Sequence, residues 1–173
     1  HYWMHNGFLN IDNEKMSKSK NNFFTVRDIA KEYDLEAVRM FMLSAQYRSP
    51  VNFSRELIQQ AQSSLERLYG ARDQLDFLES NAAQREPDAE ERAVMDAADQ
   101  ALAKFNDAMD DDLNTADALG ALFELVREIF RLPQSSVSRE TVAHIRAQMQ
   151  RMTDVLGLLA KQTDELTPEV RAM

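Results

Sequence analysis

Apolar residues recur at helical spacing in four segments of this sequence, between Ser54 and Leu159. The steps between them are three, four or seven residues, which places the apolar side chains on one face of an α-helix. Amphipathic helices joined by short loops bury these faces by packing them together, so we predict an antiparallel helix bundle and a mainly α fold. The apolar positions are Ala61, Leu65, Leu68, Leu75 and Leu78; Met95, Ala98, Leu102, Phe105 and Met109; Leu119, Leu122, Val126 and Ile129; and Val142, Ile145, Met149, Met152, Leu156 and Leu159.

Capping residues mark where the bundle helices begin. Ser54 and Ser138 precede two of them, and Asn114 or Thr115 can start a third. The acidic run at 110–112 lies just before that third helix. We expect this run to end one helix and to favour the N-terminus of the next, and we regard a Ca²⁺ or Mg²⁺ site there as the weaker alternative.

The first fifty residues lack the long helical pattern and predict shorter elements. Residues 1–12 predict two short strand-like pieces around a turn at Asn6-Gly7, and residues 13–24 predict a mobile loop. Thr25, with Asp28 three positions later, resembles a capping box at the start of a short helix. Asp34 can cap a second helix, which Ser49-Pro50 interrupts. The predicted apolar positions of that second helix are Leu35, Val38, Met42 and Leu43.

Composition excludes several classes of protein. The 173 residues are 44% hydrophobic and 28% charged, as in ordinary globular domains, and no apolar run is long enough to cross a membrane. The absence of Cys excludes a disulfide scaffold, a thiolate zinc site and a cysteine nucleophile within this sequence. The net charge of −9 is unevenly spread, because residues 1–55 hold eight basic and six acidic side chains. We therefore expect anion-binding chemistry near the N-terminus and an acidic, solvated scaffold elsewhere.

One motif carries chemistry: Lys15-Met16-Ser17-Lys18-Ser19, in the predicted loop. Two Lys three residues apart can bring their ammonium groups to a polyphosphate, and Ser hydroxyls and backbone amides can add hydrogen bonds. Such contacts help most when negative charge builds up on a leaving pyrophosphate, so they stabilise the transition state. A bare pair of Lys at this spacing is usually a solvated basic loop, and it is the full five-residue string that favours the chemical role.

That string resembles the KMSKS signature of class I aminoacyl-tRNA synthetases. Its flanks, HYWMHNGF at 1–8, FFTVRDI at 23–29 and YRSPVNFS at 47–54, look like bacterial cysteinyl-tRNA synthetases. The similarity continues through MDDDLNT at 109–115 and VLGLL at 155–159. It therefore covers nearly the whole chain.

The resemblance implies a ligase that activates cysteine with ATP and Mg²⁺ and transfers it to tRNA(Cys). It assigns the five motif residues to a mobile ATP-binding loop, in which Lys18 contacts the triphosphate as the catalytic residue and Lys15 supports closure. Residues 5–7 would approach the nucleotide. Residues 36–39 correspond to the Asp-Ala-Leu-Arg signature that heads a helical bundle packed along the tRNA stem. A cytoplasmic monomer without a membrane segment is expected.

Residues of the family that precede KMSKS include the nucleotide-binding half and a zinc site of two Cys, a His and a Glu. Because this sequence has no Cys and opens without Met, we expect a fragment that is inactive alone, with Zn²⁺ bound only in the parent protein and no metal site here. Residues 1–50 would form the KMSKS-bearing connective segment, 51–160 the helical bundle and 161–173 the lead-in to a missing C-terminal domain. Lys20-Asn21 replaces the family's usual Leu-Gly after KMSKS.

Candidates for tRNA contact lie in the net-positive N-terminal stretch. They are Lys20, Arg27, Lys31, Arg48 and Arg55. For Arg39 we favour a buried structural pair at the bundle entrance. His1 and His5 have no neighbouring carboxylate or thiolate spaced to complete a zinc site, and His144 is expected at the surface.

Two alternatives remain open. One is another ligase on the same scaffold, either the cysteine–aminocyclitol ligase that resembles this family or another class I synthetase. The other is a stand-alone helical module that binds RNA or protein and keeps KMSKS as a relic.

Overall fold

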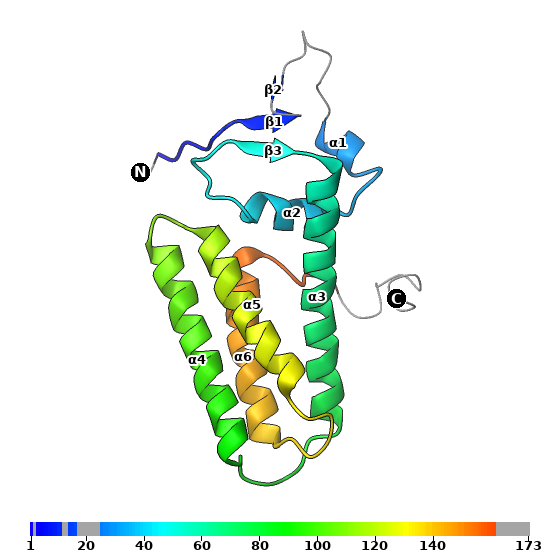
Figure 1. Ribbon diagram of the computed structural model, residues 1–173, viewed down its shortest axis with the longest axis vertical. Coiled ribbons are helices and arrows are strands. Elements are labelled where there is room, and N and C mark those ends of the chain that lie inside the picture. The colour runs from blue at the N-terminus through cyan, green and yellow to red at the C-terminus, as the bar shows by residue number, and fades with distance from the viewer. Residues whose placement is uncertain (2, 12–13, 17–24, 162–173) are drawn as a thin grey trace.

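A computed structural model describes residues 1, 3–11, 14–16 and 25–161. Figure 1 shows a bundle of long helices with a small sheet and two short helices at one end of it. In chain order the elements are β1 (Leu9–Ile11), β2 (Glu14–Lys15), α1 (Val26–Ile29), α2 (Leu35–Leu43), β3 (Val51–Phe53), α3 (Arg55–Ser80), α4 (Ala89–Asp110), α5 (Thr115–Arg131) and α6 (Arg139–Leu156).

Helices α3 to α6 form the bundle, and successive helices run in opposite directions (Figure 1). Both α3 and α4 pack against α5 and α6, and they lie on opposite sides of the α5–α6 pair. The mainly α fold and the antiparallel bundle predicted from the sequence are confirmed. Most of the predicted apolar positions are buried, and the exceptions, Met95, Leu102, Met109 and Leu159, are half-buried. None of the helices in the described part of the chain combines the length and apolar content needed to span a bilayer.

The predicted helix caps are also confirmed. Side chains of Asp34, Ser54, Asn114 and Ser138 each accept a hydrogen bond from a backbone N–H in the first turn of the helix that follows. These bonds satisfy amide groups that have no partner within the helix. An unpredicted cap, Asp88, starts α4.

The sheet differs from the prediction. Among the described residues of the 1–12 segment only Leu9–Ile11 forms a strand, and residues 14–15, expected in a loop, form another. The strand order is β2-β1-β3, with β2 antiparallel and β3 parallel to β1. Gly7 does not turn a hairpin: its N–H donates to the Tyr47 carbonyl at 2.7 Å. A Cβ on Gly7 would overlap the Ser49 carbonyl, so this glycine permits two chain segments to cross closely.

The buried face of α2 also differs from the prediction. Its buried residues are Glu36, Ala37, Met40 and Phe41. Of the predicted apolar positions, Leu35 and Met42 are exposed. Apolar residues occur all round this short helix, so their spacing did not define one face.

Candidate functional site

The KMSKS motif begins on a strand. Lys15 lies on β2 opposite Asn10 of β1, and β1 is held on its other edge by β3. Met16 is half-buried, and its N–H points to the Leu9 carbonyl at 3.5 Å. The sheet therefore anchors the backbone of the first two residues of the motif.

The remaining motif residues, Ser17, Lys18 and Ser19, lie outside the described residues, and so does Lys20. The structure therefore does not test the roles assigned to them. It defines the two points between which this segment runs, Met16 on the sheet and Thr25 at the start of α1.

A capping box fixes the second of these points. Thr25 Oγ1 accepts a hydrogen bond from the Asp28 N–H at 3.2 Å, and the Asp28 carboxylate accepts one from the Thr25 N–H at 3.0 Å. Lys31 Nζ adds a contact to the same carboxylate at 3.1 Å. The hydrogen bonds from Thr25, followed by the one from Lys31, lower the pKa of Asp28 to about 2. The carboxylate thus stays charged at neutral pH and keeps α1 capped.

Three of the described candidates for tRNA contact have acidic partners. Lys31 pairs with Asp28, Arg55 with Glu32 at 3.5 Å, and Arg48 with Asp112 at 2.9 Å. All three side chains remain largely exposed, and surface pairs of this kind contribute little free energy, so phosphate groups can compete for them. Arg27 is exposed and makes no side-chain ion pair within the described part of the chain.

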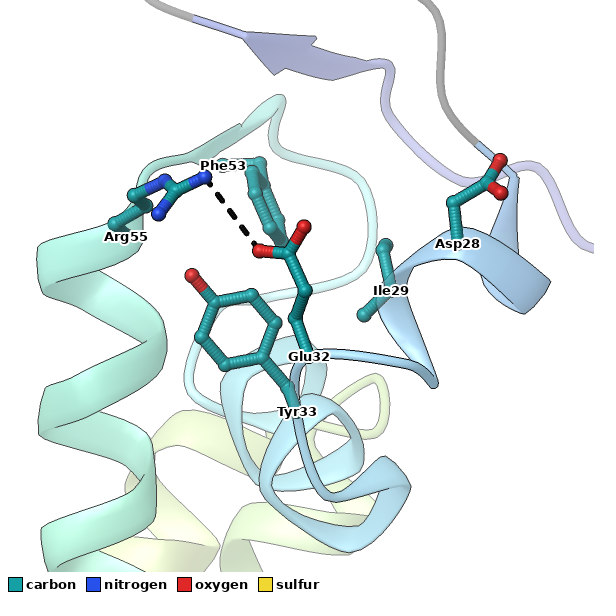
Figure 2. Close-up of a pocket in the computed structure, with 6 residues that line it drawn as sticks. All are labelled: Asp28, Ile29, Glu32, Tyr33, Phe53 and Arg55. Atoms are coloured by element: carbon teal, nitrogen blue, oxygen red, sulfur yellow. Dashed lines mark ion pairs between the residues drawn. The ribbon is translucent and has the colours of Figure 1, made fainter.

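A shallow pocket of about 160 Å³ lies where α1, the α1–α2 connection, β3 and the start of α3 meet (Figure 2). Figure 2 shows Arg55 reaching toward Glu32 across the pocket, with the Tyr33 ring beside them. The pocket contains two carboxylates against one guanidinium, which does not suit a polyphosphate. Its lining residues are Asp28, Ile29, Glu32, Tyr33, Phe53 and Arg55.

A polar cluster around Asp112 was not predicted from the sequence. The Asp112 carboxylate accepts hydrogen bonds from Tyr47 Oη at 2.9 Å, from Arg48 Nη2 at 2.9 Å and from Gln46 Nε2 at 3.3 Å. Arg48 Nε also donates to Tyr47 Oη at 2.8 Å. The bond to Tyr47 and the nearby Asp112 carboxylate raise the pKa of Arg48. No periodicity could have found this cluster, because Asp112 lies more than sixty residues from its three partners, Gln46, Tyr47 and Arg48.

Arg39 is not the buried structural residue at the bundle entrance, so that expectation is wrong. Its side chain is exposed and forms no ion pair among the described residues. Glu36 has that place: its carboxylate is buried and accepts hydrogen bonds from Tyr69 Oη at 2.6 Å and from the Leu159 N–H at 2.5 Å. Glu36 thereby ties α2 to α3 and to the chain after α6.

No group of three or more metal-ligating side chains is found among the described residues. The zinc set implied by the family resemblance needs two Cys, and this sequence has none. Asp112 of the acidic run is engaged with Tyr47 and Arg48. His144, expected at the surface, is partly buried and lies 2.8 Å from Asp99.

Comparisons with known proteins agree with the fold. Residues 1–63 match the family described as tRNA synthetases class I (C) catalytic domain, and residues 104–160 match the DALR domain. The chain therefore holds part of a class I tRNA synthetase catalytic domain together with a DALR domain.

Within that class the chain is similar to cysteine–tRNA ligases. It is 48% identical to that of Lachnospira eligens over 97% of this chain and 36% of the relative, and 49% identical to that of Clostridioides difficile over 94% and 35%. For the Symbiobacterium thermophilum ligase the identity is 45% over 99% and 37%. The family expected from the sequence is thus confirmed, and the chain spans about a third of these relatives' length.

A solved structure shares the architecture. The crystal structure of the ternary complex of Agrobacterium radiobacter K84 agnB2 LeuRS with tRNA and LeuAMS aligns with a TM-score of 0.68, covering 90% of this chain and 22% of that one. The sequence identity is 19%, so this match supports the fold alone.

Proposed function

We propose that the protein containing these residues is a cysteine–tRNA ligase, which activates cysteine with ATP and transfers it to tRNA(Cys). The observation that carries the proposal is an identity of 43–49% to ligases of that name over nearly the whole chain, KMSKS segment included. This stretch would supply the ATP loop and the helical bundle that faces the tRNA stem. Cysteine binding and the rest of the ATP site would come from other parts of the protein.

In this proposal Lys18 contacts the triphosphate and stabilises the charge that develops on the leaving pyrophosphate. Lys15 supports closure of the loop, and the backbone of Met16 and the hydroxyls of Ser17 and Ser19 complete it. The structure supports such a role, because the strand pairing of Lys15 gives the loop a fixed origin. A loop with fixed ends loses less entropy when it closes on a ligand than a free one.

The tRNA would be held by exposed cations near the sheet. We propose Lys20, Arg27, Lys31, Arg48 and Arg55 for contacts to its phosphates. Residues 1–50 would form the connective segment and residues 51–160 the bundle, with 161–173 leading to a further domain. Mg²⁺ would accompany ATP, and Zn²⁺ would be bound by residues outside this sequence. The whole protein is proposed as a cytoplasmic monomer.

The test is cysteine-dependent exchange of pyrophosphate into ATP by the full-length protein, followed by charging of a tRNA(Cys) transcript with labelled cysteine. We expect exchange with cysteine and not with serine, and charging of tRNA(Cys) alone. Transfer of cysteine to an aminocyclitol without tRNA would instead identify the related ligase. Absence of any amino-acid-dependent exchange would overturn the catalytic proposal and favour a binding module. The 173-residue chain alone is expected to give no exchange.

A further inference from the structure

The turn between α4 and α5 reaches the connection between α2 and β3, at the end of the bundle that faces the sheet (Figure 1). Asp112 and Leu113 in this turn both adopt left-handed backbone conformations, with φ of 56° and 55°. Two consecutive non-glycine residues in this region are unfavourable, so other contacts must hold them there. Two backbone hydrogen bonds close the turn, from the Leu113 N–H to the Met109 carbonyl at 3.2 Å and from the Asn114 N–H to the Ala108 carbonyl at 3.0 Å. The Asp112 carboxylate adds contacts to the other segment.

Asp112 binds residues that lie on the other segment. Its partners Tyr47, Arg48 and Gln46 all belong to the α2–β3 connection. A second link runs beside it, since Thr115 Oγ1 lies 3.5 Å from the Ala45 carbonyl. The α4–α5 turn and the start of α5 therefore hold this connection through the side chain of Asp112 and, more weakly, through that of Thr115.

The same connection holds β1. The Tyr47 carbonyl accepts the Gly7 N–H at 2.7 Å, and the Val51 N–H donates to the Phe8 carbonyl at 2.9 Å. From there β1 pairs with β2, whose Asn10–Lys15 register fixes the backbone of the first motif residue. Three hydrogen-bonded links thus connect the Asp112 carboxylate to the strand that carries Lys15: Asp112 to Tyr47, Tyr47 to Gly7, and β1 to β2.

We propose that Asp112 is a positioning residue for the ATP loop: by fixing Tyr47 and the α2–β3 connection, it sets the place of β1 and hence of the strand from which the KMSKS segment starts. The proposal rests on the function proposed above. It means that the bundle contributes to the activation of cysteine with ATP as well as to tRNA binding. A displacement of about 1 Å at a phosphate-binding group is enough to slow a reaction severely.

The variants separate positioning from loss of charge. Asp112→Gly removes the carboxylate and suits the positive φ at position 112, so the substitution adds no backbone strain there. Tyr47→Phe removes one donor and leaves the ring in place. Asp110→Asn is the control, because Asp110 is exposed, lies two residues away and has no side-chain hydrogen bond or ion pair to the described α2–β3 connection. All variants are made in the full-length protein and checked by thermal unfolding.

Two readouts test the proposal. In pyrophosphate exchange, which needs no tRNA, Asp112→Gly and Tyr47→Phe should each lower kcat/KM for ATP about tenfold, leave KM for cysteine unchanged, and combine without further loss. In hydrogen exchange, peptides covering residues 7–16 should exchange about tenfold faster in Asp112→Gly than in Asp110→Asn.

The second readout does not depend on activity, so it tests the link even if the wild-type protein shows no cysteine-dependent exchange, which would count against the proposed function. Unchanged protection of residues 7–16 in a folded Asp112→Gly variant would overturn the inference. Additive losses in the double variant, or a rise in KM for cysteine, would equally overturn it.

Discussion

At the scale of single residues, buried carboxylates join segments that are distant in the sequence. Glu91 is almost fully buried and accepts hydrogen bonds from Arg85 Nη1 at 2.8 Å, from the Asp88 N–H at 3.0 Å and from the Ser138 N–H at 2.8 Å. One side chain thus ties the α3–α4 loop, the start of α4 and the start of α6. Burial by itself would raise the pKa of Glu91, but the bonds from Asp88, Ser138 and Arg85 outweigh it, and the pKa is lowered.

This lowered pKa predicts how stability depends on pH. The folded protein holds the Glu91 proton less tightly than the unfolded chain, so the stabilisation is complete above the usual glutamate pKa and is lost as pH falls below it. Glu91→Gln should lower the free energy of unfolding by about 1–3 kcal/mol at pH 7, and this difference should shrink in acid. Urea unfolding at several pH values measures it. The exposed neighbour, changed as Glu90→Gln, is the control, and identical pH profiles for the two variants would contradict the assignment.

At the scale of elements, substitution of two glycines by alanine should change the stability in opposite directions. A Cβ on Gly7 would overlap the backbone at Ser49, whereas a Cβ on Gly120, in the middle of α5, would meet nothing within 4 Å. Gly7→Ala should therefore destabilise the sheet by about 1–3 kcal/mol. Gly120→Ala should stabilise α5 by about 0.5–1 kcal/mol, because alanine loses less entropy in a helix. Thermal unfolding of both variants checks the pair, and equal shifts of Tm in the same direction would refute the close crossing at Gly7.

The elements also show what the sequence could predict. Long helices with regular stripes, such as Leu119 to Ile129, were predictable because their spacing and their caps agree. The sheet was not, because its strands are two or three residues long and β1 pairs with β3 some forty residues away. The roles of Glu36 and Asp112 could not be predicted for a related reason. A polar residue whose hydrogen-bond partners are distant in the sequence leaves no local pattern.

At the scale of the whole molecule, the charge is divided between the sheet end and the bundle. Residues 56–173 hold 12 basic and 23 acidic side chains, whereas residues 1–55 have a small positive excess. Binding of tRNA by this chain should therefore be weak, confined to the sheet end and strongly dependent on salt.

Titration of a tRNA(Cys) transcript at two salt concentrations tests this division. Raising the salt from about 50 to about 200 mM should weaken binding roughly tenfold or more, since each phosphate contact releases counterions. Arg27→Gln should reduce that salt dependence. Arg131→Gln, at the far end of α5, should leave it unchanged. Tight binding that salt does not affect would contradict phosphate contacts at the sheet end.

The catalytic role of Lys18 can be measured directly in the full-length protein. If Lys18 stabilises the transition state of adenylate formation, Lys18→Ala should raise the activation free energy of cysteine-dependent pyrophosphate exchange by about 2–4 kcal/mol, the effect of one lost transition-state contact. Lys104→Ala, on an exposed face of α4, removes an equal charge and should exchange at the wild-type rate. Unchanged exchange in a folded Lys18→Ala variant would contradict the catalytic role given to the KMSKS segment.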